Sequence, residues 1–341
     1  MKKVLFVIYG LENRGGSERV ATLLANNLVD NYEVDIICRK GDRFAYQLDE
    51  RINTVNLDKS GINLILGFKK QIENNSYDFV VIHSMTKLTV SLLLAGLKHH
   101  NLITVEHISS ESSGFILKTL KRLLYPKVNN IVVLTKKDAE FYNKLHDSVS
   151  VIRNPSPFAS KPLYSSQSRK IIAIGSLIKR KGFDRLIEAW KDIEPLSKDF
   201  TLDIYGEGEE KENLLRLIEE YKLKKIRLMG QTDNVYEIYK SASFFIMTSH
   251  FEGLPMVLIE AQSLGLPIVS YDCPYGPSEI ITDGANGYLV EDNNKYLLVE
   301  KVLSLINNTQ LRKSMSYNAL ANSKYYSIEE VKKRWLDLFG M

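Results

Sequence analysis

Two glutamates, Glu252 and Glu260, stand eight positions apart in the segment 249–261. Pro255 suits the first turn of a helix, where its missing N–H is not needed, so we expect Glu252 just before a helix and Glu260 about a turn and a half inside it. The start of a helix binds phosphate because unpaired N–H donors and the positive end of the dipole lie together. A carboxylate beside such donors indicates a ligand with both phosphate and hydroxyl groups. The donors would be the backbone N–H groups of Gly253, Leu254 and Met256.

Three consecutive cations, Lys179, Arg180 and Lys181, stand between Gly175 and Gly182, where a strand ends and a helix is expected to begin. Arginine offers a planar two-pronged contact and lysine a mobile point charge, so together they neutralise the charge on a departing diphosphate. The alternative is a basic turn in solvent. Taken alone, this segment favours the alternative.

The segment 10–19 follows the first expected strand and contains the pair Gly15 and Gly16, with Ser17 as the expected N-cap of the next helix. Paired glycines let a ligand approach the backbone closely. Glu18 would hold an acceptor hydroxyl, or it would only favour the helix dipole. The chain has neither the Gly-x-Gly-x-x-Gly spacing of a dinucleotide-binding fingerprint nor a Gly-Lys-Ser/Thr phosphate loop.

His107 stands at the end of another expected strand, where an imidazole would hydrogen-bond a sugar hydroxyl or take part in proton movement. A lone histidine is more often structural, and His83 occupies a similar strand end. No group of His, Cys, Asp or Glu has the spacing of a zinc site, and no Asp-x-Asp occurs, so we expect no metal and no metal-bridged diphosphate.

The charge of the chain is uneven although its net charge is only +4. Residues 1–165 hold 22 lysines and arginines against 16 acidic residues, whereas residues 166–341 hold 23 against 25. Within the basic half, the stretch 117–127 sets cations beside leucines, which is typical of a helix lying on an anionic membrane or of a packed helix with a solvated face. The longest apolar run, 88–97, is too short to span a bilayer. With only Cys38 and Cys273 present, we expect a cytoplasmic protein.

Short β-branched runs alternate with amphipathic segments along the chain, which predicts parallel sheets covered by helices. The expected strands are Lys3–Tyr9, Glu33–Cys38, Phe79–His83, Leu102–Val105, Ile131–Leu134, Val149–Ile152, Ile171–Ile174, Thr201–Tyr205, Ile226–Met229, Phe244–Met247 and Pro267–Ser270. The expected helices are 17–30, 62–74, 87–98, 111–124, 136–145, 182–194, 209–221, 233–241, 256–264, 294–307 and 328–339. A stretch rich in proline and serine, 154–168, interrupts the alternation as a linker would.

In open α/β sheets the binding crevice lies beyond the carboxyl ends of the strands. The candidate residues all follow expected strands, which places them at such an edge. We therefore expect an N-terminal α/β domain over 1–153, the linker, and a second α/β domain over 169–323.

Together these motifs resemble the family-4 retaining glycosyltransferases, and the resemblance runs over nearly the whole chain. Its most specific part is Glu252-x7-Glu260 with Gly253, Pro255, Ala261, Gly265 and Pro267. Weaker matches are Gly15-Gly16-Ser17-Glu18, Lys181-Gly182 and Gly206-Glu207-Gly208. The resemblance implies the GT-B architecture of two facing Rossmann-like domains with a cleft between them. It also implies that a C-terminal helix, within 324–341, packs back on the N-terminal domain.

The resemblance further implies a role for each matching residue. Glu260 would hold the nucleotide ribose, and Glu252 would lie near the donor sugar and its phosphates. Arg180 and Lys181 would stabilise the leaving diphosphate, and His107 would contact the sugar or flank the reaction centre. Other positions would line the donor or the acceptor: Gly16, Gly175, Ser176, Gly206, Gln231, Thr232 and the run Gly253, Leu254, Pro255 and Met256 on the donor, and Gly15 and Glu18 on the acceptor. The family usually has arginine where this chain has Ser176, so Arg180 or Lys179 would supply that charge.

The function implied is transfer of a hexose or N-acetylhexosamine from a UDP-sugar to a glycan acceptor, with retained configuration and without a metal. The acceptor would be a polyprenyl-diphosphate-linked oligosaccharide used in polysaccharide or glycoprotein glycan assembly, and the basic N-terminal domain would meet an anionic membrane surface. Two alternatives are a sugar-nucleotide epimerase of the same fold and a non-catalytic sugar-nucleotide-binding subunit of a complex. No feature of the sequence points to nucleic acid.

Overall fold

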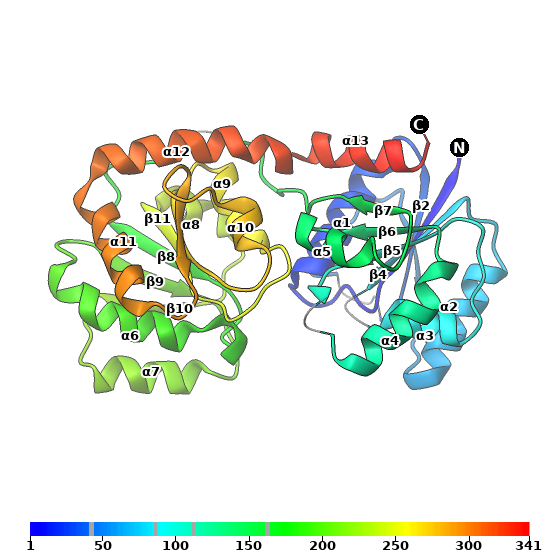
Figure 1. Cartoon of the computed structure of the whole chain (residues 1–341), viewed down its shortest axis with the longest axis horizontal. Coiled ribbons are helices and arrows are strands. Elements are labelled where there is room, and N and C mark those ends of the chain that lie inside the picture. The colour runs from blue at the N-terminus through cyan, green and yellow to red at the C-terminus, as the bar shows by residue number, and fades with distance from the viewer. Residues whose placement is uncertain (41–43, 85–86, 111–112, 161–163, 341) are drawn as a thin grey trace. The chain divides into compact units, whose positions relative to one another are not determined.

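The computed structural model describes residues 1–40, 44–84, 87–110, 113–160 and 164–340. The chain forms two compact units. Unit 1 comprises Met1–Pro155 and Ile328–Met341, and unit 2 comprises Ser156–Ser327. The two stretches that make up unit 1 are blue to green and red in Figure 1.

Unit 1 is built on a seven-stranded parallel sheet with the order β3-β2-β1-β4-β5-β6-β7. Residue Val4 of β1 pairs with Val34 on one side and with Phe79 on the other. The chain therefore moves outward in one direction from β1 and returns to lay β4 on its other side. The strands are β1 (Lys3–Val7), β2 (Glu33–Cys38), β3 (Asn53–Asn56), β4 (Phe79–Ser84), β5 (Leu102–Glu106), β6 (Asn130–Val133) and β7 (Val149–Val151).

Helices cover this sheet because its central strands carry apolar side chains on both faces, which alternate along each strand. Leu5 and Val7 of β1 belong to a core that joins the sheet to four helices, α2 (Gly61–Glu73), α3 (Leu88–Leu94), α4 (Phe115–Leu124) and α5 (Lys136–Tyr142). Outside this core, α1 (Gly16–Leu28) packs against α13 (Ile328–Leu338). Phe339, just after α13, lies 4.5 Å from the ring of Phe79.

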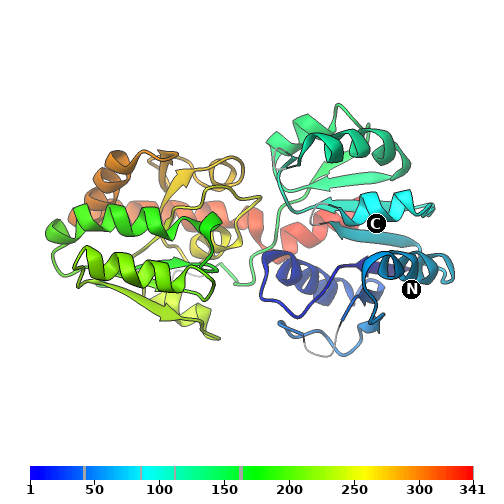
Figure 2. The same ribbon diagram turned by 90° about the horizontal axis from the view of Figure 1, so that it is seen from below.

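Unit 2 is built on a six-stranded parallel sheet with the order β10-β9-β8-β11-β12-β13. Its strands are β8 (Lys170–Ile174), β9 (Thr201–Tyr205), β10 (Ile226–Gly230), β11 (Phe244–Met247), β12 (Ile268–Asp272) and β13 (Gly287–Glu291). Its helices are α6 (Phe183–Ile193), α7 (Lys211–Glu220), α8 (Val235–Ser241), α9 (Met256–Ser263), α10 (Pro277–Ile280), α11 (Lys295–Asn307) and α12 (Thr309–Ser323). Trp190 of α6, fully buried, lies in a core shared with α7 and α11, and Figure 2 shows the two sheets and their helices from below.

Four of these elements were not expected from the sequence: β3, β13, α10 and α12. Two helix starts also differ from expectation. Gly15, not Ser17, is the N-cap of α1, and Ser17 lies inside the helix with its hydroxyl donating to Glu18. Pro255 is the N-cap of α9 rather than its first residue, so the helix begins at Met256. Glu252 remains in the loop and Glu260 within the helix.

Candidate functional site

The strand order of unit 2 reverses between β8 and β11, which lie side by side at the centre of the sheet. At such a switch point the loops that follow the two strands diverge toward opposite directions and leave a crevice beyond their carboxyl ends. A small cavity at this point is lined by Lys181 from the loop after β8, by Thr248 and Ser249 from the loop after β11, and by Val257 of α9. The topology alone therefore brings together the loop with three consecutive cations and the loop that carries Glu252.

An ion cluster occupies this place. The carboxylate of Glu252 accepts a hydrogen bond from Lys181 Nζ at 2.6 Å and another from Arg180 Nη1 at 3.1 Å. Glu252 is only 7% exposed and Lys181 16%, whereas the Arg180 side chain is 37% exposed. Burial raises the pKa of Glu252, but the charges of Lys181 and Arg180 outweigh burial and lower it. The cluster thus holds one carboxylate and two cations, with a net charge of about +1.

Backbone geometry fixes both loops of the cluster. Gly182, the C-cap of the turn that carries the cations, has φ +62°, and a Cβ at this position would lie 2.2 Å from the carbonyl oxygen of Thr248. Thr248 in turn donates from its hydroxyl to the Gly182 carbonyl at 2.8 Å. Only glycine allows so close a contact with φ in this region. The guanidinium of Arg185 donates to the carbonyls of Thr248 and Ser249, the latter at 2.9 Å, so both sides of the junction are held.

The start of α9 lies a few residues after Glu252 in the sequence. In the described part of the chain, the backbone N–H groups of Gly253 and Met256 have no hydrogen-bond partner. Further along, Glu260 is 2% exposed, and its carboxylate accepts from the hydroxyl of Tyr239 of α8 at 2.9 Å. The two glutamates of the motif therefore have different environments, one between cations and one beside a phenol.

The loops after β8, β9 and β10 are stacked through their backbones. A Cβ on Gly206 would lie 1.9 Å from the carbonyl oxygen of Gly175, so these two backbones are in direct contact. The N–H of Gly206 donates to the carbonyl of Gly230 at 2.9 Å, which ties in the third loop. Three more positions of interest lie on these loops, with Ser176 and Gln231 exposed and Thr232 half-buried.

In unit 1 the predicted residues lie at the corresponding carboxyl ends of strands, at the start of α1 and after β5. Gly15 is the N-cap of α1, Gly16 is exposed, and the Glu18 carboxylate folds back over Gly15. This position of Glu18 matches the helix-dipole interpretation of its charge. His107 follows β5 and forms a buried pair with His83, the end of β4, at 2.9 Å between Nδ1 of His83 and Nε2 of His107.

A buried polar cluster that no sequence pattern predicted lies beside His107. Glu106 of β5 and Lys121 of α4 form an ion pair at 2.6 Å with both side chains 2% exposed. The hydroxyls of Tyr125 and Tyr142 also donate to Glu106, and Lys121 donates to Tyr142. The pattern of 117–127 suggested that Lys121 lies on a solvated basic face, but its side chain is buried. It anchors α4 to the end of β5.

The described residues hold no group of three or more His, Cys, Asp or Glu side chains placed to bind a metal ion. Within the same residues, no helix is both long enough and apolar enough to cross a membrane.

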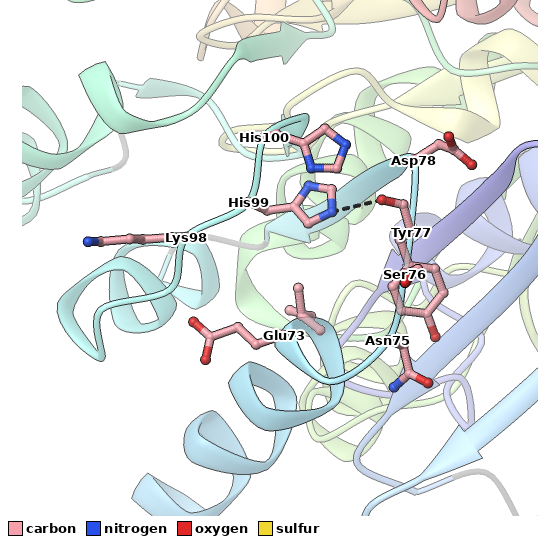
Figure 3. Close-up of a pocket in the computed structure, with 9 residues that line it drawn as sticks. Glu73, Asn75, Ser76, Tyr77, Asp78, Lys98, His99 and His100 are labelled. Atoms are coloured by element: carbon pink, nitrogen blue, oxygen red, sulfur yellow. Dashed lines mark hydrogen bonds between the residues drawn. The ribbon is translucent and has the colours of Figure 1, made fainter.

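Another hollow lies in unit 1, away from this edge of the sheet. Figure 3 shows this hollow of about 650 Å³, which is lined by the residues that precede β4 and β5. The His99 ring in it contacts the Tyr77 carbonyl at 3.0 Å through Nε2 and accepts from the Asn101 N–H at 3.1 Å through Nδ1. Because both ring nitrogens contact backbone groups, His99 stabilises the loop and is not available to a ligand. The hollow lies at the amino edge of the sheet, opposite the edge where parallel sheets bind ligands.

Comparison with known proteins gives the family. Residues 14–156 match the model described as Glycosyltransferase Family 4, and residues 158–321 match the one described as Glycosyl transferases group 1. An amylovoran biosynthesis glycosyltransferase of Erwinia amylovora, AmsD, is 33% identical over the whole of both chains. The chain belongs to the family 4 glycosyltransferases. The chain is also 26% identical to a Campylobacter jejuni protein, over 100% of its own length and 99% of the relative's. That relative is an α-1,4-N-acetyl-D-galactosaminyltransferase, and its name gives a glycan on diphospho-undecaprenol as its substrate.

Solved structures share the fold of the glycosyltransferase. Anabaena HepE, solved in complex with UDP and glucose, superposes with a TM-score of 0.84 at 16% identity over 99% of each chain. Staphylococcus aureus TarM, solved with UDP among its ligands, superposes with a TM-score of 0.82 at 17% identity over 100% of each chain. With two parallel Rossmann-like sheets, the glycosyltransferase has the GT-B fold.

Proposed function

We propose that this glycosyltransferase moves a hexose or N-acetylhexosamine from a UDP-sugar to a polyprenyl-diphosphate-linked glycan, with retained configuration and without a metal ion. The observation that carries the proposal is Glu252 held between Lys181 and Arg180 at the switch point of unit 2. A diphosphate is attracted to the positive cluster, and a carboxylate in the same place binds hydroxyls. A nucleotide sugar presents both groups.

The donor side follows from the contacts. A carboxylate has about four acceptor positions, and Lys181, Arg180 and the Ser249 side chain use three of them on Glu252. The remaining position is open to a sugar hydroxyl, while the cations turn to the diphosphate. The unpaired N–H groups of Gly253 and Met256 add donors for phosphate oxygens. Glu260, oriented by the hydroxyl of Tyr239, would accept from the ribose hydroxyls.

The reaction needs no nucleophile from the protein. The bond between the anomeric carbon and the diphosphate oxygen breaks, and the electron pair goes to the diphosphate. The acceptor hydroxyl oxygen bonds to the same face of the anomeric carbon, and its proton passes to the departing diphosphate oxygen. Arg180 and Lys181 stabilise the charge that develops on the leaving group, which is the largest single contribution in many enzymes. His107 contacts the transferred sugar.

The relatives support the acceptor class, since one of them is named for a diphospho-undecaprenol glycan substrate. In unit 1, α4 carries Phe115, Ile116 and Leu123 with exposed fractions of 84%, 77% and 66%. Lys118 and Arg122 lie on the same helix, which has no acidic residue. An apolar and basic helix face of this kind binds anionic lipid surfaces, where a polyprenyl acceptor resides.

The central test is a screen of UDP- and GDP-sugars with an undecaprenyl-diphosphate-linked acceptor, measuring nucleotide diphosphate release and product anomer. We expect UDP release, an α-linked product from an α-linked donor, and an unchanged rate in EDTA. Glu260→Ala should weaken UDP binding, and Lys181→Ala should mainly slow transfer. Normal rates in both variants would refute the site. A new epimer formed without acceptor would identify an epimerase, and tight UDP binding without turnover under any acceptor would identify a binding subunit.

The membrane contact has its own test. Co-sedimentation with phosphatidylglycerol vesicles should fall as salt rises, because exposed charges are screened. The double variant Phe115→Ser/Ile116→Ser should sediment less. Tyr296→Ser, which removes a side chain that is 83% exposed in unit 2, is the matched control and should sediment normally. Equal sedimentation of all three proteins, or no salt dependence, would remove α4 as the contact.

A further inference from the structure

Two buried histidines meet at the carboxyl edge of the unit 1 sheet. β4 and β5 are neighbours, and His83 of β4 pairs in register with Val105 of β5. His107 comes two residues later, directly after β5. Their rings are nearly parallel, at 17°, with centroids 5.1 Å apart, and Phe6 of β1 lies 5.1 Å from the His83 ring. Strand pairing and packing therefore fix both rings against each other.

The two histidines differ in their access to a ligand. His83 is 1% exposed, whereas His107 is 9% exposed. Nδ1 of His83 and Nε2 of His107 are 2.9 Å apart, a hydrogen-bond distance that requires one proton between them. Nε2 of His83 is buried and has no partner within the described residues. A substrate can thus reach His107, while His83 lies behind it.

Counting protons assigns the donor of this bond. Burial lowers the pKa of both rings, that of His107 to about 4, so each is neutral and carries one proton. If His107 donated from Nε2, His83 would carry its proton on Nε2 as a buried N–H without a partner, which folded proteins rarely tolerate. If His83 donates from Nδ1, only a lone pair is left unpaired. The second arrangement is favoured.

We infer that His83 is a positioning residue, which donates from Nδ1 to Nε2 of His107 and thereby makes His107 present an N–H at Nδ1 to the substrate. The inference rests on the proposed function for the statement that the group met by His107 is a sugar or its acceptor. An N–H donor at this place hydrogen-bonds an oxygen of the substrate and cannot act as a base. The tautomer of His107 is set by the ring behind it, as orienting partners set other functional histidines.

A matched set of variants tests the role of His83. His83→Asn retains an amide N–H near the position of Nδ1, His83→Gln moves its amide to the position of Nε2, and His83→Phe has no donor. We expect His83→Asn to keep most of kcat, and His83→Gln and His83→Phe to lose about tenfold to a hundredfold in kcat with little change in the KM of the donor. Equal kcat in His83→Phe and the unaltered protein would overturn the inference.

A spectroscopic readout needs no substrate and no variant. In nitrogen-15-labelled protein, long-range proton-nitrogen spectra show which nitrogen of each of the six histidines carries the proton. We expect both His83 and His107 in the Nδ1–H form, which is the rarer tautomer of a free histidine side chain. Protonation of His107 at Nε2 would overturn the inference even if the protein transfers sugar. Conversely, the Nδ1–H signature in a protein that transfers no sugar would leave the inference standing and refute the proposed function.

Discussion

Removing the charge of Lys181 tests how the ion cluster holds the loops of unit 2. Glu252 is 7% exposed and would be left with Arg180, whose side chain is 37% exposed. A buried carboxylate that loses its only partner costs about 3 to 5 kcal/mol, and an adjacent cation shifts a carboxyl pKa by about 1 to 3 units. Since Arg180 remains 3.1 Å away, we expect Lys181→Met to destabilise unit 2 by about 2 kcal/mol at pH 7.

The pH dependence has a definite sign. The pKa of Glu252 is lowered in the folded protein, so its stabilising contribution is complete above the unfolded pKa near 4.5 and is lost as pH falls through the folded value. In Lys181→Met the folded pKa rises. The difference in stability between the variant and the unaltered protein should therefore be largest at pH 6 to 8 and shrink below about pH 4.5.

The chain carries its own probes for this measurement. Trp190 is buried in unit 2 and Trp335 in unit 1, and they are the two tryptophans of the sequence. In a Trp335→Phe background, urea unfolding followed by fluorescence reports on Trp190 and so on unit 2. Lys179→Met is the matched control, because Lys179 pairs with Asp184 at the surface with its side chain 66% exposed. That control should change stability by less than about 1 kcal/mol.

A double variant decides whether the cluster is the cause. Lys181→Met combined with Glu252→Leu removes the uncompensated buried charge, so it should recover most of the stability lost by Lys181→Met alone. The cluster does not hold the loops together if the stability losses of Lys181→Met and Glu252→Leu simply add in the double variant. The same conclusion follows if Lys181→Met costs no more stability than Lys179→Met.

Three further predictions concern Gly182, His107 and Tyr239. Gly182→Ala should destabilise unit 2 by about 2 kcal/mol or more in urea unfolding, since its Cβ would meet the Thr248 carbonyl; an unchanged midpoint would contradict the contact. The pKa of His107 is about 4, so transfer rates should show no ionisation of this ring between pH 6 and 8. The stability of unit 1 should decline as pH falls from 6.5 toward 4, because the unfolded chain then binds a proton that the folded ring does not. The decline for this ring is up to about 1.4 kcal/mol per pH unit. Tyr239→Phe should raise the Kd of UDP about fivefold by calorimetry, because the Glu260 carboxylate loses about 1 kcal/mol of orienting hydrogen bond; no change in Kd would place the ribose elsewhere.

Much of this site could be predicted because it depends on local rules. Alternating strands and helices imply parallel sheets, and parallel sheets place the loops after β8 and β11 at one edge. Arg180, Lys181 and Glu252 therefore come together without any knowledge of their contacts. Whether they bind a donor stays a prediction.

The remaining features depend on partners that are distant in sequence. Lys121 was grouped with its basic neighbours in 117–127, but its partner Glu106 lies on a different element, so no local pattern reveals the pair. The strand β3 (Asn53–Asn56) was missed because its sequence, Asn-Thr-Val-Asn, has little apolar character and its residues are half-buried or exposed. The His83 contact could have been anticipated, since His83 ends one expected strand and His107 follows another, and the two strands proved to be neighbours.

The division of unit 1 into two stretches of sequence bears on how the chain folds during synthesis. The rings of Tyr32 and Phe79 pack on Phe339, with ring centroids 5.2 and 4.5 Å apart. Phe339 is synthesised more than two hundred residues after either of them, so this contact forms only at the end of translation. Unit 2 is a single stretch and is complete once Ser327 has left the ribosome. The unit made first would therefore finish folding last, with an apolar face of its sheet in need of protection while the rest of the chain is translated.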